Sequence, residues 1–155
     1  MTGDILLFFG VEDLIDREIE HYENSMFTHA AVSINSTEIV EAWWEGVRIS
    51  TLEGRGPFAR FQTITPLTPI QQTGLEMYAR GCVGKRYNYP GLVGFLVKKW
   101  FGMKHNPLGS EHSVWCSQLV VEIYRACGIN LLPDLADRDI TPADLANSKL
   151  LQRTS

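Results

Sequence analysis

The sequence is short of the residues that build several common kinds of site. It has three cysteines, and no two of them form a C-x-x-C pair, which argues against a disulfide scaffold and against a zinc ribbon. Only 21% of the residues are charged and the net charge is −4, so there is no positive surface of the kind that nucleic acid needs. Repeats and low-complexity segments are absent as well. We therefore expect no nucleic-acid partner.

Long hydrophobic runs are also scarce. Ile5–Phe9 is apolar, but it follows Asp4, has no basic flank and is too short to span a membrane, so we expect it to be a buried strand. Because no signal peptide is visible, the sequence predicts a cytoplasmic protein, and it leaves open an export route that a sequence does not show. The chain has 155 residues, 45% of them hydrophobic, which is enough to bury a core in one domain spanning 1–155.

The most informative segment is an amphipathic helix between Ser113 and Gly128. Ser113 is the predicted N-cap and Gly128 the left-handed stop. Cys116 therefore lies in the first turn, where unpaired N–H groups and the helix dipole stabilise a thiolate. A plain core cysteine is the alternative, and Cys127 at the other end of the helix is an example of it. The apolar side chains recur at three- and four-residue steps and form one stripe: Trp115, Cys116, Leu119, Val120, Ile123, Tyr124 and Cys127.

A cysteine nucleophile needs a base, and the chain offers four histidines. His29 is the best placed, because Thr28–Asn35 and Glu38–Trp43 are predicted to form a hairpin and a histidine at a strand edge can point into a cleft. The other three fall in polar or turn-rich segments and are expected to be solvated or peripheral: His21, His105 and His112. His112 and Cys116 have a spacing suited to a metal pair, but no third ligand is evident, so we expect neither a metal nor another cofactor.

The same hairpin nominates Glu41 as a third site residue. A loop of odd length pairs Ala31 with Glu41 and makes Glu41 a diagonal neighbour of His29, with the backbones about 7–8 Å apart. A loop of even length would put the two on opposite faces. A buried glutamate needs a partner, and an imidazolium would be one; a solvated Glu41 on a one-sided sheet is the alternative. The odd register is favoured because it places the apolar residues on one common face: Ala30, Val32, Ile34, Val40 and Ala42.

A second apolar segment covers residues 91–102 and contains two lysines and a tryptophan near its end. It is only about half the length of a membrane-spanning helix. A buried helix is the usual interpretation of such a run, and an interfacial helix in contact with a membrane is the alternative.

The order of the expected elements indicates an α+β fold rather than alternating α/β. A strand and a hairpin come first, then a helix near Ile70–Gly81, the cysteine helix and a helix start at Thr141–Pro142.

Five short motifs follow one another along the chain: Gly3–Leu7, Thr28–Val32, Ile39–Ala42, Gly46–Arg48 and Trp115–Val120. In this order they resemble the circularly permuted branch of the NlpC-type papain-like superfamily, in which the histidine precedes the cysteine. This is the YiiX-like group of cell-wall-hydrolase relatives, more distantly similar to lecithin:retinol acyltransferases. The resemblance covers nearly the whole chain. It implies a permuted papain-like fold, in which an antiparallel sheet or half-barrel packs against the helix that carries the cysteine.

By that resemblance Cys116 is the nucleophile, His29 the base and Glu41 the orienting residue of a cysteine hydrolase. The implied reaction is cleavage of an amide bond through a thioester, and the implied substrate is a peptidoglycan stem peptide or a related cell-wall fragment. The same residues would also serve a thiol-dependent lipid acyltransferase or thioesterase. A non-catalytic binding domain of the same fold is the third interpretation.

Substrate-binding residues are implied less directly. Tyr87 and Tyr89 match a region that often lines the cleft in such proteins, although a turn with aromatic packing explains them as well. Trp115, beside the proposed nucleophile, is the third candidate.

Overall fold

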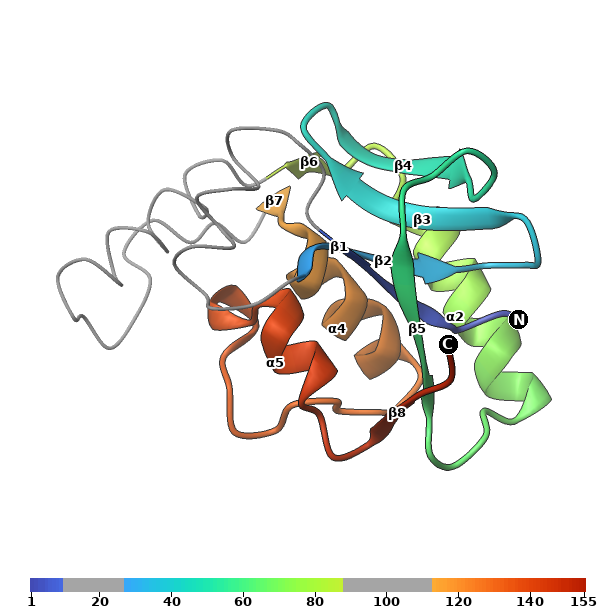
Figure 1. The fold of residues 1–155 in the computed structure, drawn as a ribbon, viewed down its shortest axis with the longest axis vertical. Coiled ribbons are helices and arrows are strands. Elements are labelled where there is room, and N and C mark those ends of the chain that lie inside the picture. Colours follow the sequence, from blue (N-terminus) through green and yellow to red (C-terminus); the bar gives the residue numbers. More distant parts are fainter. Residues whose placement is uncertain (10–26, 88–112) are drawn as a thin grey trace, which may run out of the picture.

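An antiparallel six-stranded sheet is the main element of the computed structural model, which describes residues 1–9, 27–87 and 113–155 (Figure 1). The strand order is β4-β3-β2-β1-β5-β8. The strands are β1 (Ile5–Phe9), β2 (Phe27–Ser33), β3 (Glu38–Trp43), β4 (Gly46–Thr51), β5 (Phe58–Thr63) and β8 (Leu151–Arg153). Two short parallel strands, β6 (Arg86–Tyr87) and β7 (Ser113–Val114), form a separate pair. The main sheet is antiparallel throughout and packs against a few helices, which confirms the α+β class.

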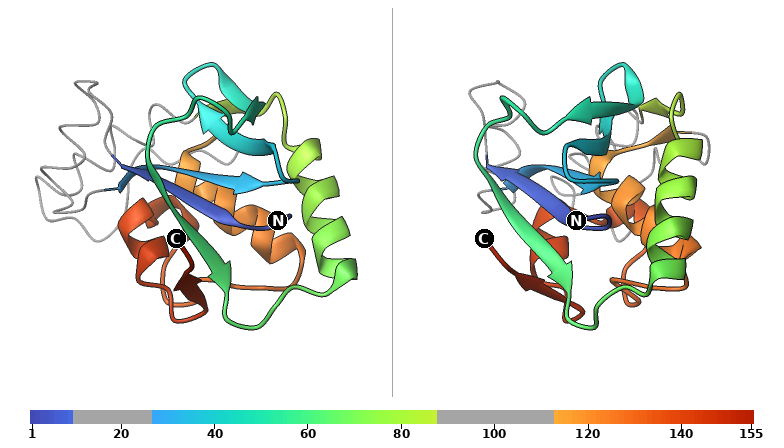
Figure 2. Two further views of the ribbon diagram at one scale, coloured as in Figure 1. Left: turned by 45° about the vertical axis from the view of Figure 1, so that its right-hand side comes forward. Right: turned by 90° about the vertical axis from the view of Figure 1, so that its right-hand side faces the viewer.

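Three helices lie on the same side of the sheet, with α2 outside α4 (Figure 2). They are α2 (Pro69–Gly81), α4 (Cys116–Ala126) and α5 (Pro142–Ala146), and a short 3₁₀ turn covers Asp137–Asp139. α2 and α5 each begin with a capping box and a proline in the first turn, so the local sequence explains where both start. Among the described residues, no helix is long and apolar enough to cross a membrane. Residues 91–102, and with them the predicted membrane contact, lie outside those ranges.

The β2–β3 hairpin has the odd register that the apolar pattern favours. Ala31 pairs with Glu41 and Val32 with Val40. The predicted apolar face packs against the helices in the main core, which includes Ala30, Val32, Ile34, Val40, Ala42, Leu75, Leu119, Val120 and Ile123. The opposite face carries a smaller cluster of Leu6, Phe8, Ala31 and Ile39, covered in part by Leu52 and Phe58. Both faces of the sheet are therefore buried here, and Glu41, on the second face, is fully buried rather than solvated.

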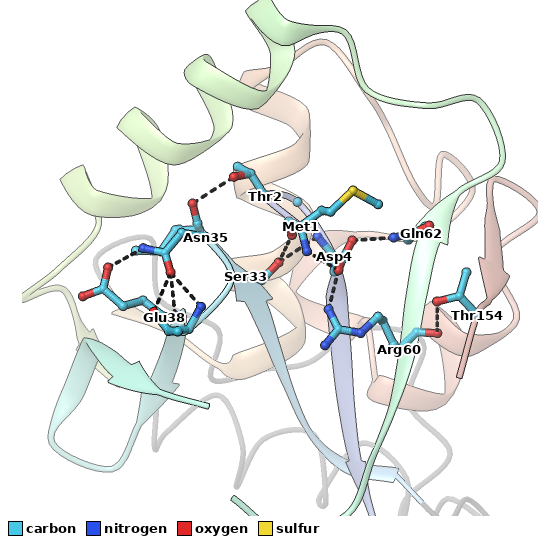
Figure 3. A network of polar contacts seen from close by, with 12 residues as sticks. Met1, Thr2, Asp4, Ser33, Asn35, Glu38, Arg60, Gln62 and Thr154 are labelled. Carbon is cyan, nitrogen blue, oxygen red and sulfur yellow. Dashed lines mark hydrogen bonds and ion pairs between the residues drawn. The ribbon is translucent and has the colours of Figure 1, made fainter. Parts of the chain in front are cut away.

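A polar network closes the end of the sheet away from His29 (Figure 3). Asp4, just before β1, is 3% exposed. It accepts hydrogen bonds from Arg60 and from Gln62, the latter at 2.8 Å, and its Oδ2 lies 2.7 Å from the amino group of Met1. Burial would raise the pKa of Asp4, but these partners lower it below its usual value. The network ties β1 to β5 and leaves the carboxylate well paired.

The start of β4 is joined to the segment before β6 by backbone contacts. Val47 donates to the carbonyl oxygen of Lys85 at 2.8 Å, and Gly84 donates to that of Val47 at 2.9 Å. Gly46 adopts φ +129°, and a Cβ there would lie 2.7 Å from the same Lys85 oxygen. Only glycine suits that position. The contacts place β6, and β7 beside it, next to the β3–β4 turn.

Candidate active site

Helix α4 places Cys116 at its first residue. The predicted N-cap at Ser113 is wrong: Ser113 belongs to β7, and Trp115 occupies the cap position without a side-chain hydrogen bond. The helix starts later because the parallel pairing of β6 and β7 holds Ser113 and Val114 extended. Gly128, at φ +80°, is the left-handed stop that the sequence predicts. The change moves Cys116 closer to the helix start, where the first N–H groups have no partner within the helix and are not capped by Trp115.

His29 lies between Cys116 and Glu41. The β2–β3 ladder ends at the Ala31–Glu41 pair, and His29 is two residues beyond it on the same face as Glu41. Its Nε2 lies 2.9 Å from Oε2 of Glu41. The Cys116 thiol interacts electrostatically with the same ring, and this interaction raises the pKa of His29 and lowers that of Cys116. The structure thus brings together the three residues that the sequence predicted as catalytic.

Glu41 is fully buried and has partners on both oxygens. While Oε2 faces His29, Oε1 accepts hydrogen bonds from Arg48 Nε at 3.0 Å, from Ser50 Oγ at 2.6 Å and from Arg55 Nη2. We call Arg48, Ser50 and Arg55 the carboxylate clamp. A buried charge with this many donors is stable where a bare one would not be.

The carboxylate clamp was missed at the sequence level, although part of it had a visible signal. In the β3–β4 ladder, Arg48 is directly opposite Glu41 and Ser50 opposite Ile39. Extending the predicted hairpin by one strand would therefore have found both. Arg55 had no such signal, because it comes from the turn between β4 and β5 rather than from a strand.

Aromatic rings enclose the polar group. Trp43 meets the His29 ring edge-on with centroids 5.1 Å apart, and Phe8 lies 5.6 Å from the same ring. The guanidinium carbon of Arg48 is 4.7 Å from the Trp43 ring centroid, and that of Arg55 is 5.5 Å from it. Contact with the rings restricts the imidazole and both guanidinium groups to few orientations.

The electrostatics of the site favour an ion pair between Cys116 and His29. Burial would lower the pKa of His29, but its hydrogen bonds and charge interactions with Cys116 and Glu41 raise it to about 9. Burial would likewise raise the pKa of the Cys116 thiol, but His29, the backbone N–H of Ala30 and the Ser117 hydroxyl lower it below its usual value. The pKa of Glu41 falls to about 2, since His29 and the clamp outweigh burial. These shifts all favour the charged forms, so the site stabilises a thiolate–imidazolium pair beside an ionised Glu41.

A second contact fixes α4 at its other end. The hydroxyl of Tyr124, a fully buried side chain, donates to the carbonyl oxygen of Gly3. Gly3 adopts φ +89°, and a Cβ there would clash with the end of the Leu67 side chain. The helix is thus attached to the sheet both at Cys116 and two turns later.

The other cysteines provide an internal comparison. Cys82 is buried and Cys127 is partly buried, and burial raises the pKa of each thiol. Cys127 contacts the carbonyl oxygen of Gln71 at 3.4 Å, as a packing cysteine would.

The structure describes only some of the predicted substrate-binding residues. The backbone of Tyr87 pairs with Val114, two residues before Cys116. Trp115 is 5% exposed, so it presents little surface, and its role stays a prediction. Tyr89, His21, His105 and His112 lie outside the described residues.

The site has few donors left for a metal ion. Glu41 is fully engaged, so Cys116 Sγ and one nitrogen of His29 are the two donors left for a metal ion. Within residues 1–9, 27–87 and 113–155, no group of three His, Cys, Asp or Glu side chains could hold a metal ion. The described residues therefore do not form a metal site.

Comparison with known proteins identifies the fold. No protein-family model matches the chain, and no curated protein does so. The solved structure of the metalloprotein YiiX (DUF1105) from Escherichia coli O157:H7 is similar over 100% of this chain and 96% of its own, with a TM-score of 0.75 and 17% sequence identity. The chain has a YiiX-like fold.

Proposed function

We propose that the protein is a cysteine hydrolase that cleaves an amide bond, with a permuted papain-like arrangement of its site. The observation that carries the proposal is the grouping of three side chains. Cys116 stands at the start of α4 and interacts electrostatically with His29, whose Nε2 lies 2.9 Å from the buried Glu41. Nucleophile, base and orienting acid occur in this order in thiol hydrolases on unrelated folds.

The proposed reaction uses each group once in each half. The Cys116 thiolate attacks the carbonyl carbon of the amide, and the carbonyl oxygen becomes an oxyanion. His29 gives its proton to the leaving amine as the C–N bond breaks, which leaves a thioester on Cys116. Neutral His29 then takes a proton from water, the hydroxide attacks the thioester, and the thiolate is released with the acid product. Glu41 holds the imidazole and stabilises its charged form throughout.

The start of α4 offers a site for the oxyanion. The helix has 11 residues, and its Trp115 cap provides no side-chain acceptor, so its first N–H groups can donate to a substrate oxygen beside Cys116. A short polar side chain at the cap, as Ser113 would have been, would compete for those groups.

The proposed substrate is a peptide, with a peptidoglycan stem peptide or related cell-wall fragment as the first class to test. It rests on the sequence resemblance, since at 17% identity the similarity to YiiX concerns the fold alone. The description of YiiX as a metalloprotein is not transferred to this chain, because its described residues leave only two free donors.

Thiol reactivity tests the proposal without knowledge of the substrate. Iodoacetamide alkylation of each cysteine is followed by peptide mass spectrometry between pH 5 and 9.5, in the wild type and in His29→Ala. Cys116 should react well below the pKa of about 8.5 of a free thiol, and the variant should lose that advantage. Cys82 and Cys127 are matched controls in the same sample, and both should react slowly. A Cys116 as inert as Cys127 would refute the proposal.

Substrate classes are compared next, using Cys116→Ala as the blank. Release of amine from muropeptides without hydrolysis of acyl esters would support the amidase. The reverse result would favour the lipid acyltransferase or thioesterase. A protein that has a reactive Cys116 and binds one of these substrates, but converts neither of them, would be a binding domain.

A further inference from the structure

The carboxylate clamp is distributed unevenly over the two oxygens of Glu41. One oxygen, Oε1, receives all three of its donors, and two of them are cationic. The other oxygen has one partner, His29. Because three donors converge on one oxygen, turning the carboxylate away from this orientation would break those three hydrogen bonds. The clamp therefore keeps the other oxygen directed at the imidazole.

The clamp also changes the charge that His29 meets. A lone buried carboxylate would attract the imidazolium with its full negative charge. Here two guanidinium groups also pair with the carboxylate and partly neutralise that charge. Arg55 is 22% and Arg48 35% exposed on their side chains, so neither is fully screened by water. The Cys116 thiol on α4 also interacts with His29, and Glu45 lies 4.0 Å from Arg48.

We propose that Arg48 and Arg55 are positioning residues that act through Glu41, orienting it towards His29 while limiting how strongly it holds the imidazolium proton. The inference builds on the proposed Cys116–His29 pair. A base held too strongly in its charged form cannot release its proton to the leaving group, and general acid–base catalysis is most efficient when the pKa lies near the working pH. The arginines thus prevent a buried triad carboxylate from over-stabilising the imidazolium.

The sign of the effect separates this role from a purely structural one. Loss of the positive charge of Arg55 removes a repulsion on the imidazolium, so the titration of His29 should move to higher pH. For two charges on opposite sides of one carboxylate at an effective dielectric of about 20, and after allowance for partial exposure, the shift is roughly one pH unit. If Arg55 only held the turn in place, its loss would loosen the Glu41–His29 bond and move the titration to lower pH.

The test is a ¹³Cε1 NMR titration of the histidines between pH 6 and 11, with the His29 signal assigned from His29→Gln. In Arg55→Met the midpoint of His29 should rise by about one unit, and in Arg55→Lys, which keeps the charge, it should stay within about 0.3 unit of wild type. Ser50→Ala removes a donor from the same oxygen without a change in charge and should shift it by less than half as much as Arg55→Met.

A matched control lies at the other end of the sheet. Arg60 is 25% exposed and pairs with the buried Asp4, so Arg60→Met removes the same type of contact far from His29 and should leave its midpoint unchanged. If circular dichroism shows that Arg55→Met does not fold, the test is made with Arg48→Met, in which the side chain lost is more exposed. The His29 midpoint should rise in that variant too. A midpoint that stays or falls in a folded Arg→Met variant overturns the inference. An unreactive Cys116 in the wild type would instead overturn the proposed function, and the two failures are therefore distinct.

Discussion

Replacement of Glu41 by glutamine should inactivate the Cys116 thiol while leaving the shape of the site almost unchanged. The carboxylate clamp donates three hydrogen bonds to Oε1, and the amide oxygen of glutamine would take that position because it can accept them. The amide NH₂ would then face His29 Nε2 and donate to it. His29 would carry its proton on Nδ1 and could no longer accept the thiol proton.

The size of the effect follows from the shifted titrations. The pKa of His29 is about 9 against an ordinary 6.5, which at 1.36 kcal/mol per unit favours the imidazolium by about 3 kcal/mol after the cost of burial. A thiol that has returned to a pKa of about 8.5 is only about 0.3% thiolate at pH 6. Because a thiolate of low pKa is also a weaker nucleophile, the alkylation rate of Cys116 at pH 6 should fall by about 10- to 100-fold rather than by the full factor.

The assay is the alkylation rate of Cys116 at pH 6, with urea unfolding measured on the same preparation. Glu38→Gln is a suitable control, since Glu38 is on the same strand but is partly exposed and pairs with Asn35 and Arg80 instead. It should alkylate at the wild-type rate. If a folded Glu41→Gln also reacts at the wild-type rate at pH 6, the assignment of Glu41 as the orienting residue is wrong.

Three further outcomes are expected. Ser117→Ala removes a hydroxyl 3.9 Å from the Cys116 sulfur that helps to lower its pKa, so alkylation at pH 6 should slow several-fold with little change in melting temperature, and an unchanged rate would count against this contact. Gly46→Ala should lower the free energy of unfolding in urea by about 2–4 kcal/mol, because its Cβ would lie 2.7 Å from a backbone oxygen. Gly54→Ala is the control: its φ is +74° with no atom within 4 Å, so it should lose only about 1 kcal/mol. Equal losses would contradict the steric argument. The pKa of Glu41 is lowered from 4.5 to about 2, so its contribution to stability is complete above about pH 4.5 and is lost as the pH falls through 2. Between pH 5 and 2 the free energy of unfolding of the wild type should therefore fall by up to about 3 kcal/mol more than that of Glu41→Gln. Parallel plots of the free energy of unfolding against pH for the two proteins would refute this.

The sequence predicted the site residues that depend on local periodicity. Alternation along two strands was enough to establish the hairpin register and to put Glu41 on the face of His29, because a slip of one residue would have exposed the apolar set. Helical spacing was enough to place Cys116 in the first turn of α4.

What could not be predicted depends on contacts between distant segments. Ser113 has the chemistry of an N-cap, but pairing of β7 with β6 overrides that local preference. Arg55 reaches Glu41 from a turn whose path no periodicity describes. The pairing of Asp4 with Arg60 likewise joins the residue before β1 to a residue of β5 that is 56 positions later in the sequence.

The hydrogen bond between Tyr124 and Gly3 helps to position Cys116 from outside the candidate site. Tyr124 follows Cys116 by eight residues, or about 12 Å along the helix axis, and its hydroxyl determines how far α4 can slide along the sheet. The position of Cys116 relative to His29 therefore depends partly on a contact outside the candidate site. A substitution at Gly3, where φ is +89° and a side chain would meet the end of the Leu67 side chain, should change the reactivity of Cys116 by displacing α4, with Cys116, His29 and Glu41 themselves unchanged.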